Sequence, residues 1–315
     1  TLVEAGHRLL AEGLVARSWG NLSLRLDAQT MAVTPSGIPY PDLTEAMIVL
    51  VDLETDAWSG EWKPSGERKV HREIYRRRPD VAAIVHTHQS AASVCAAARI
   101  PVPWHGGTVA CAPYGLPGTK GLTRGTVTAL GNGAAVLMAN HGVFTVGEDL
   151  EMAFNRIRDL EIACADLTAK QAVHPLPDRT DTPWNPDWLQ PIPGSEASWL
   201  SDAPFSLAWS RRGQALPALL DDLAQLAGRR VRIATSLPTR RPPDDVILVQ
   251  DQGVSVWGPD AEALAMVVEK TARAALGAEG LGGAKTFPAW EAALMRFVYK
   301  NSYAKQSRKA VSAKG

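Results

Sequence analysis

One stretch of the sequence decides the fold: Val81-Ala82-Ala83-Ile84-Val85-His86-Thr87-His88, followed at once by the alanine-rich segment Ser90–Ala98. The first part is apolar and β-branched, which predicts a buried strand. The second part predicts a helix that ends before Ile100-Pro101, because a proline disfavours helical backbone in the residue before it. A strand that leads into a covering helix is typical of layered α/β domains.

The same alternation continues on both sides of this stretch. Apolar runs predict strands over 22–26, 31–34, 48–52 and 134–139, and helical spacing predicts helices over 66–77 and 149–169. We therefore expect an α/β domain over residues 1–174, in which helices cover a sheet.

A break in this pattern follows the first domain. Residues 175–204 contain seven prolines and the tryptophans Trp184, Trp188 and Trp199. Proline interrupts helices and donates no hydrogen bond to a sheet. We predict an ordered connector, held on a domain surface by its tryptophans.

The chain then repeats part of itself. Val246–Glu262 aligns with Ala135–Glu151 at a constant offset, with identical residues at 137/248, 142/253, 143/254, 147/258, 149/260 and 151/262. His141 becomes Gln252 in the second copy, and no histidine follows His174. We therefore predict that residues 205–315 form a smaller α/β domain, a degenerate partial repeat that lacks a metal site.

The overall composition excludes several classes of protein. The 33 Lys and Arg residues balance 33 Asp and Glu residues, which gives no electrostatic case for nucleic acid. No apolar run has the length of a membrane helix, and the three cysteines lack metal-type spacing. These features predict a cytoplasmic protein that acts on a small molecule, without a nucleic-acid or membrane partner.

Histidines gather in the first domain. His86 and His88 are two residues apart in a strand, so their side chains lie on the same face. Alone, such a pair also fits a polar strand end. His141 follows a second buried strand, however, and three imidazoles leave one coordination position open, as in catalytic zinc sites.

Glu67 is the candidate acid/base. It stands at the start of the helix predicted over 66–77, where the helix dipole alone would explain a carboxylate. Beside a metal ion it could instead transfer a proton to and from a carbon acid. His71 lies on the same helical face and could orient Glu67 or simply pack.

Three polar turns offer backbone N–H groups together with a hydroxyl or an amide, which suits a phosphate or carboxylate. Each turn alone is also an ordinary turn. The candidate substrate-binding residues are Gly20, Asn21, Thr34, Ser36, Gly37, Ser65 and Gly66.

The ordered set of motifs resembles the class II aldolase/adducin family over about residues 1–170. The motifs are Gly20-Asn21-x-Ser23, Thr34-Pro35-Ser36-Gly37-Ile38-Pro39, Pro64-Ser65-x-Glu67, Arg78-Pro79-Asp80, His86-Thr87-His88, Cys111-Ala112-Pro113-Tyr114 and Asn140-His141-Gly142.

This resemblance implies a layered sandwich with a central, mainly antiparallel sheet flanked by helices. It also implies a divalent metal, zinc or alternatively manganese, held by His86, His88 and His141, with Glu67 as the acid/base. The implied activity is that of an aldolase, a lyase that cleaves a small sugar phosphate or related polyhydroxy carbonyl compound through a metal-chelated enediolate. The resemblance further implies a homo-oligomer.

Two departures from the family concern the substrate. Where fuculose-phosphate aldolases have two serines before the glutamate, this chain has Ser65-Gly66, and their tyrosine acid aligns with His105. Tyr299 and Tyr303 could replace another tyrosine that those enzymes supply from the C-terminus, or could be core aromatics. The alternative functions are a decarboxylase or epimerase of the same family and a non-catalytic adducin-like binding protein.

Overall fold

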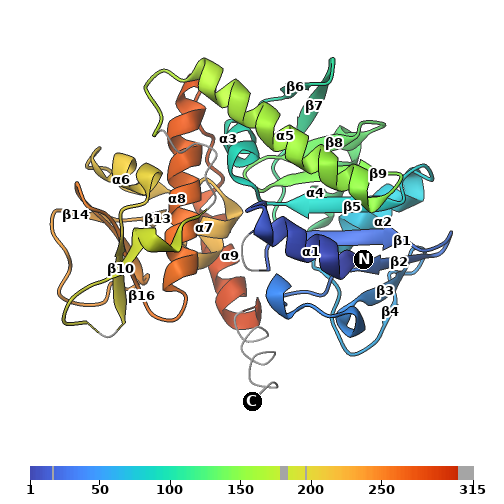
Figure 1. Ribbon diagram of the computed structural model, residues 1–315, viewed down its shortest axis with the longest axis horizontal. Coiled ribbons are helices and arrows are strands. Elements are labelled where there is room, and N and C mark those ends of the chain that lie inside the picture. Colours follow the sequence, from blue (N-terminus) through green and yellow to red (C-terminus); the bar gives the residue numbers. More distant parts are fainter. Residues whose placement is uncertain (16–17, 178–183, 196, 304–315) are drawn as a thin grey trace.

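The computed structural model describes residues 1–15, 18–177, 184–195 and 197–303 of the 315-residue chain, and forms two α/β units that lie side by side (Figure 1). The α-helices are α1 (Leu2–Ala11), α2 (Arg68–Arg77), α3 (Ser90–Ala98), α4 (Lys120–Leu130), α5 (Leu150–Gln171), α6 (Pro204–Ser210), α7 (Asp221–Ala227), α8 (Ala261–Ala278) and α9 (Ala289–Val298). Short 3-10 and π turns are η1 (Tyr40–Asp42), η2 (Glu45–Met47), η3 (Pro186–Trp188), η4 (Glu279–Leu281) and η5 (Tyr299–Tyr303).

The first unit is built on a nine-stranded sheet of order β4-β3-β2-β1-β5-β9-β8-β7-β6. Only the β7–β8 pair is parallel, so the expected mainly antiparallel sheet is present. The strands are β1 (Asn21–Arg25), β2 (Thr30–Val33), β3 (Val49–Asp52), β4 (Trp58–Ser59), β5 (Ala83–Thr87), β6 (Val102–Trp104), β7 (Gly107–Ala112), β8 (Ala135–Met138) and β9 (Val143–Gly147).

Helices cover both faces of this sheet, because alternate residues of its central strands are apolar on opposite sides. On one face, Val85 and Leu137 pack with apolar residues of α1, α3 and α5. On the other face, Ile84 and Val136 pack with residues of α2 and α4. This layering fixes β5 at the centre of the unit.

The second unit has a five-stranded sheet of order β10-β11-β16-β15-β14 and a two-stranded sheet, β12-β13. The strands are β10 (Leu189–Pro191), β11 (Ser198–Ser201), β12 (Leu216–Pro217), β13 (Arg230–Val231), β14 (Ile233–Ala234), β15 (Val246–Val249) and β16 (Gly253–Trp257).

The Pro/Trp-rich segment, predicted as an ordered connector, also contributes two strands to a sheet. Its strands β10 and β11 form one side of the second sheet, where β11 pairs with β16. This is possible because β11 contains no proline. Pro191 lies in the edge strand β10, where the absence of a backbone N–H donor costs little. As expected, Trp184 and Trp199 pack against the core of the second unit.

The two units meet through α3 and α8, which lie side by side (Figure 1). Gly277 allows the close approach, since a Cβ atom there would lie 2.8 Å from Val94 Cγ1 and 2.9 Å from Thr168 Cγ2. The contact places the start of α7 against the strand ends of the first sheet, because the Asp221 N–H donates to Asn140 O at 3.0 Å.

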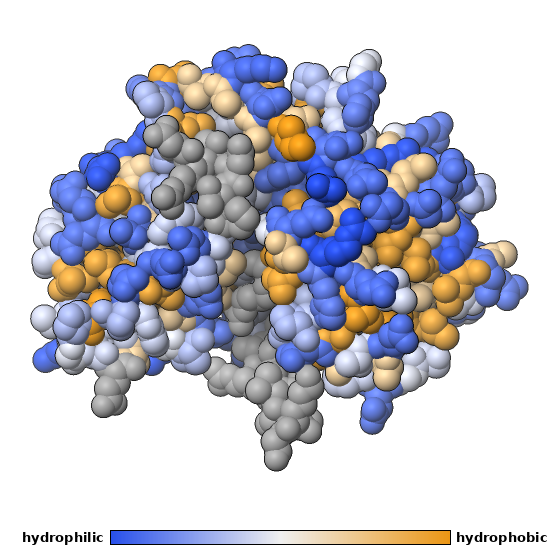
Figure 2. Space-filling model, viewed as in Figure 1, coloured by the Kyte–Doolittle hydropathy of each residue, from blue (hydrophilic) through white to orange (hydrophobic). Residues whose placement is uncertain are grey.

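The surface is mixed in character. On the face drawn in Figure 2, hydrophilic residues spread over both units and hydrophobic residues form separate groups. Among the described residues, none of the helices combines the length and the apolar character that crossing a membrane requires.

Candidate active site

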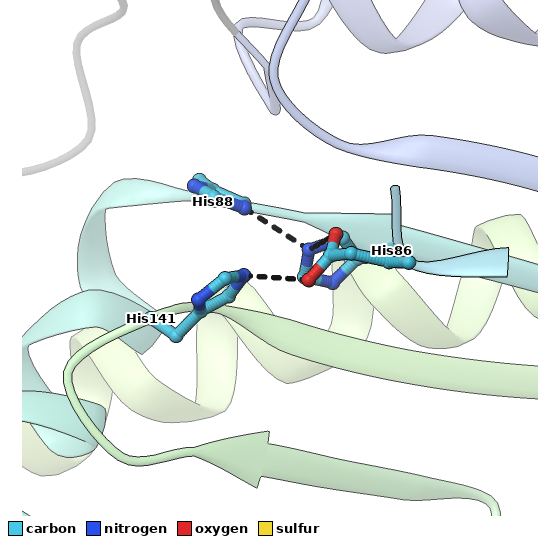
Figure 3. Close-up of side chains that lie close together, drawn as sticks. His86, His88 and His141 are labelled. Atoms are coloured by element: carbon cyan, nitrogen blue, oxygen red, sulfur yellow. Dashed lines mark hydrogen bonds and ion pairs between the residues drawn. The ribbon is translucent and has the colours of Figure 1, made fainter. Parts of the chain in front are cut away.

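Four of the residues singled out by the sequence come together at the end of β5. His86 and His88 extend from this strand, His141 from the turn between β8 and β9, and Glu67 from the residue before α2. One ligand atom from each lies within 4.8 Å of the others. Figure 3 shows the three imidazoles pointing toward a common centre.

The local backbone explains how His141 reaches this centre. Asn140 has a φ of 60°, a left-handed conformation that asparagine tolerates better than most residues. At Gly142, a Cβ atom would lie 2.4 Å from Thr87 O and 3.1 Å from both His86 Cε1 and His88 Cδ2. The Asn-His-Gly sequence therefore makes a turn tight enough to bring His141 beside β5.

The atoms at the centre are the Nε2 nitrogens and the carboxylate of Glu67. His86 Nε2 lies 3.0 Å from His88 Nε2 and 2.9 Å from Glu67 Oε2, and His141 Nε2 lies 2.9 Å from Glu67 Oε1. Among the described residues, Glu67 Oε1 and His141 Nε2 are buried and have no hydrogen-bond partner apart from their contact with each other. Buried polar atoms are rarely left so, which is evidence that they serve another group.

The pKa values of the cluster residues shift in different directions. Burial alone would raise the pKa of Glu67, but His86 and His141 lower it well below its ordinary value. Burial would lower the pKa of His141, but Glu67 and Asp221 raise it well above the usual range. Burial lowers the pKa of His88 to about 4, against the opposing effect of Asp222. Glu67 is therefore anionic at neutral pH, as a proton acceptor must be.

A buried chain of hydrogen bonds orients Glu67. Asn21 Nδ2 donates to Glu67 Oε2 at 2.9 Å, and Asn21 Oδ1 lies 2.5 Å from His71 Nε2. Ser23 Oγ lies 2.6 Å from His71 Nδ1 and 2.8 Å from the Tyr75 hydroxyl. Burial lowers the pKa of His71 to about 3, so this imidazole is neutral. His71 thus takes the orienting role considered from the sequence, acting through Asn21.

Two of the predicted polar turns lie side by side. Ser36 N donates to Lys63 O at 2.8 Å, and Ser65 N donates to Thr34 O at 3.1 Å. The helix α2 begins at Arg68 rather than at 66, and Ser65 Oγ accepts from Glu67 N. A cavity of about 240 Å³ lies against these turns and the cluster. Six of the residues predicted to bind substrate line this cavity: Gly20, Asn21, Ser36, Gly37, Ser65 and Gly66.

Thr34 was predicted to bind substrate but does not line this cavity. Its hydroxyl accepts from Leu22 N at 3.1 Å, and its side chain is buried. The structure therefore gives Thr34 a structural contact between β1 and the turn that follows β2.

His105 is not brought to the cluster either. With Gly106 it forms the two-residue turn between β6 and β7, and both have positive φ, 46° and 74°. Such a hairpin turn points its side chains outward. The His105 side chain is 67% exposed, and its Nε2 lies 3.7 Å from Asp159 Oδ2 on α5. Sequence alignment alone could not show this outward turn.

The second unit also lines the cavity, in keeping with the suggestion from the sequence that Tyr299 could reach the site. Gln225 of α7, three apolar residues of α9 and Tyr299 are among its lining residues; the apolar residues are Leu294, Met295 and Val298. The side chain of Tyr303 lies outside the described residues.

Two further residues of the second unit touch the cluster itself. Asp221 Oδ2 lies 2.7 Å from His141 Nδ1, and Asp222 Oδ1 lies 2.8 Å from His88 Nδ1. Both aspartates start α7, where the helix dipole is the ordinary explanation for an acid. In the sequence these residues appear only as an Asp-Asp pair after two leucines. Such a pair does not indicate a contact with His88 or His141.

Comparison with known proteins agrees with this fold. The family described as "Class II Aldolase and Adducin N-terminal domain" matches residues 1–167. An L-fuculose 1-phosphate aldolase structure matches with a TM-score of 0.52 and 35% identity, over 57% of this chain and 90% of that chain. The chain belongs to the class II aldolase and adducin family.

Curated relatives with a similar first unit are named as aldolases. A 5-deoxy-D-ribulose 1-phosphate aldolase of Bacillus thuringiensis is 32% identical over 53% of this chain and 81% of its own length. A 5-methylthioribulose-1-phosphate/5-deoxyribulose-1-phosphate aldolase of Rhodospirillum rubrum is 34% identical over 51% of this chain and 75% of its length. The L-fuculose phosphate aldolase of Escherichia coli K12 is 33% identical, over 54% and 82%.

Proposed function

We propose that the protein is a metal-dependent aldolase that cleaves a small ketose 1-phosphate. The observation that carries this proposal is the convergence of His86, His88, His141 and Glu67 beside a cavity lined by anion-binding turns. The family membership and the names of the curated relatives support the same reaction class.

The donor set suits a divalent metal. Three imidazole nitrogens and one carboxylate oxygen are ligands that zinc accepts, and manganese is the alternative. Glu67 Oε1 and His141 Nε2, which contact only each other among the described residues, belong to this cluster. When bound, the metal would supply positive charge that stabilises the oxygens next to the substrate's breaking carbon–carbon bond.

Glu67 is the residue we assign to proton transfer. Its carboxylate is anionic, is 13% exposed and is oriented by Asn21. In the cleavage direction it returns a proton to the carbon beside the carbonyl, and in the condensation direction it removes that proton. The cavity gives the substrate access to Glu67.

The phosphate of the substrate fits the two neighbouring turns. Ser36, Gly37, Ser65 and Gly66 provide hydroxyl and backbone groups without a basic side chain. The cavity is also lined by the apolar side chains of Leu294, Met295 and Val298. We therefore infer a substrate whose far end is a methyl or another apolar group, as in the deoxy and methylthio sugars named for two relatives.

A panel of ketose 1-phosphates tests this proposal. The zinc-loaded protein is given substrates that end in a methyl or a hydroxymethyl group, and the aldehyde and the three-carbon keto phosphate are measured. We expect kcat/KM roughly 10-fold or more higher for the methyl compound. Leu294→Asn should reduce that preference. Epimerised sugar or carbon dioxide instead of an aldehyde would favour the epimerase or decarboxylase alternative.

We also propose that the second unit is a degenerate copy of the first. The strand order β10-β11-β16-β15-β14 parallels β1-β5-β9-β8-β7, and the last pair is parallel in both. A Cβ atom on Gly253 would meet Ser201 O, as one on Gly142 would meet Thr87 O.

A second detail supports the duplication. Glu161 of α5 accepts from the N–H groups of Ala91 and Ala92 at the start of α3. Glu269 of α8 accepts from the N–H groups of Phe205 and Ser206 at the start of α6. These two carboxylates occupy matching places in the two units, although the offset alignment does not pair them.

A further inference from the structure

Two carboxylates of the second unit are fully buried beside the metal ligands of the first. The exposed fraction is 0% for Asp221 and 1% for Asp222. Aspartate is almost never fully buried unless it is paired, because desolvation of its charge is costly. The position of these two side chains therefore requires partners that compensate the charge.

The partners are the outer nitrogens of the imidazoles. His141 Nδ1 lies 2.7 Å from Asp221 Oδ2, and His88 Nδ1 lies 2.8 Å from Asp222 Oδ1. His86 Nδ1 lies 2.9 Å from Val143 O, a carbonyl that can only accept. Each Nδ1 thus faces an acceptor that favours a proton on it, so that each Nε2, which lies at the centre, can bind a metal.

We propose that Asp221 and Asp222 are positioning residues that complete the metal site from the second unit, so that metal binding requires both units of the chain. The proposal rests on the metal assigned under the proposed function. It gives the second unit a direct role at the active site, although that unit has no metal ligand of its own.

Both aspartates are fixed from several sides. Lys270 of α8 contacts Asp222 Oδ2, and its Nζ donates to His88 O at 3.2 Å. The Tyr114 hydroxyl donates to Asp221 Oδ1 at 3.3 Å. These contacts hold the start of α7 in register with the strand end and the turn that carry the imidazoles.

The charge balance also fits a divalent cation. Glu67, Asp221 and Asp222 contribute three negative charges when ionised, and Lys270 contributes one positive charge. With a metal on each Nε2 and one proton on each Nδ1, the imidazoles would be neutral, and these contacting side chains would carry two negative charges, the amount that Zn²⁺ or Mn²⁺ would neutralise.

Metal affinity is the direct test. Zn²⁺ binding to Asp221→Ala and Asp222→Ala is measured by competition with a chromophoric chelator, and Co²⁺-loaded protein is compared by absorption spectroscopy. We expect each variant to bind Zn²⁺ about 10–100-fold more weakly and to change the Co²⁺ spectrum. The Asn variants should lie between, because an amide oxygen still accepts but carries no charge.

Two controls separate positioning from general damage. Asp244 of the same unit forms an ion pair with Arg296 away from the cluster, so Asp244→Ala should bind Zn²⁺ like the parent. Asp222→Ala leaves Lys270, 11% exposed, without its carboxylate. The double variant with Lys270→Met removes that unpaired charge, so thermal stability should recover while Zn²⁺ affinity stays weak.

Affinity within twofold of the parent in both alanine variants would overturn the proposal. So would recovery of parental affinity in the double variant, because the unpaired Lys270 would then explain the loss. None of these measurements uses a sugar substrate. A protein that binds Zn²⁺ as expected but cleaves no ketose phosphate would contradict the proposed function and leave this inference standing.

Discussion

At the scale of single residues, Glu67 is the side chain on which the proposed chemistry depends. Its carboxylate contacts the imidazoles of His86 and His141 and accepts a hydrogen bond from Asn21. The three imidazoles would still offer three metal ligands without this carboxylate. Glu67→Gln should therefore retain Zn²⁺ but lose about 10²–10⁴ in kcat, the contribution typical of one general acid/base.

Steady-state kinetics and metal analysis on the same preparation check this prediction. Glu73→Gln is the matched control, because Glu73 lies on α2 and pairs only with the surface arginines Arg76 and Arg77. Undiminished kcat in the Glu67 variant would contradict its assignment to proton transfer.

Gly66 provides a second test at this scale. It lines the cavity next to Ser65 and contributes no hydroxyl. Gly66→Ser should tighten the binding of a ketose 1-phosphate, since one added bond to a charged group contributes about 1.5–3 kcal/mol. Calorimetric titration measures the effect, and weaker binding in the variant would argue against a phosphate at this turn.

The sequence predicted this cluster well and its surroundings poorly. His86 and His88 share a face because of strand periodicity, a local property, and Glu67 and His141 were recognised by their motifs. Asp221 and Asp222 contact histidines 80 and 134 residues away in the chain. Nothing local specifies such a contact, because it arises only when the two units pack.

At the scale of secondary structure, α3 and α6 each begin at a carboxylate from a neighbouring helix. Glu269 Oε2 accepts from Ser206 N and Ser206 Oγ, both at 2.7 Å, and Oε1 accepts from Phe205 N at 2.8 Å. Glu269→Gln should lower the free energy of unfolding by about 1–3 kcal/mol, because an amide cannot replace all of these acceptor contacts.

Denaturant unfolding measures this loss, and Glu161→Gln should show a similar one. Glu262→Gln, on the exposed first turn of α8, should stay within about 0.5 kcal/mol of the parent. Equal stability of all three variants would show that these carboxylates do not hold the helix starts.

The strand and helix predictions were accurate where the pattern was periodic, as for β5 and α3. The strand within the Pro/Trp-rich segment was not predicted, because β11 is short, with only Trp199 and Leu200 between two serines. Its pairing with β16 is what makes it a strand. Such a strand depends on tertiary context more than on its own residues.

At the scale of the whole molecule, the proposed duplication predicts one metal per chain. The strand register places Leu200, Asp202 and Gln252 where the first unit has His86, His88 and His141. Elemental analysis should give one equivalent, lost in His141→Ala and kept in Gln252→Ala. Two equivalents per chain would rule out a degenerate second copy.

The shared site also predicts that the two units unfold together. Zinc would be bound by residues of the first unit that are held by aspartates of the second, so binding should stabilise both. At a free concentration 100 times its Kd, zinc should add about 2.7 kcal/mol to the free energy of unfolding. Calorimetry should show one transition that moves to higher temperature, whereas two transitions of which zinc shifts only one would contradict the coupling.

The matched carboxylates Glu161 and Glu269 have a consequence for solvent exchange. Amide protons at the start of a helix usually exchange quickly, because they lack an intrahelical carbonyl partner. Here the amides of Ala91 and Ala92, and of Phe205 and Ser206, are each held by one of these carboxylates. Their deuterium uptake would therefore be slow until α5 leaves α3 or α8 leaves α6. The exchange rate of each pair of amides therefore reports the opening of its own unit. A comparison of the two rates would show which unit opens more readily.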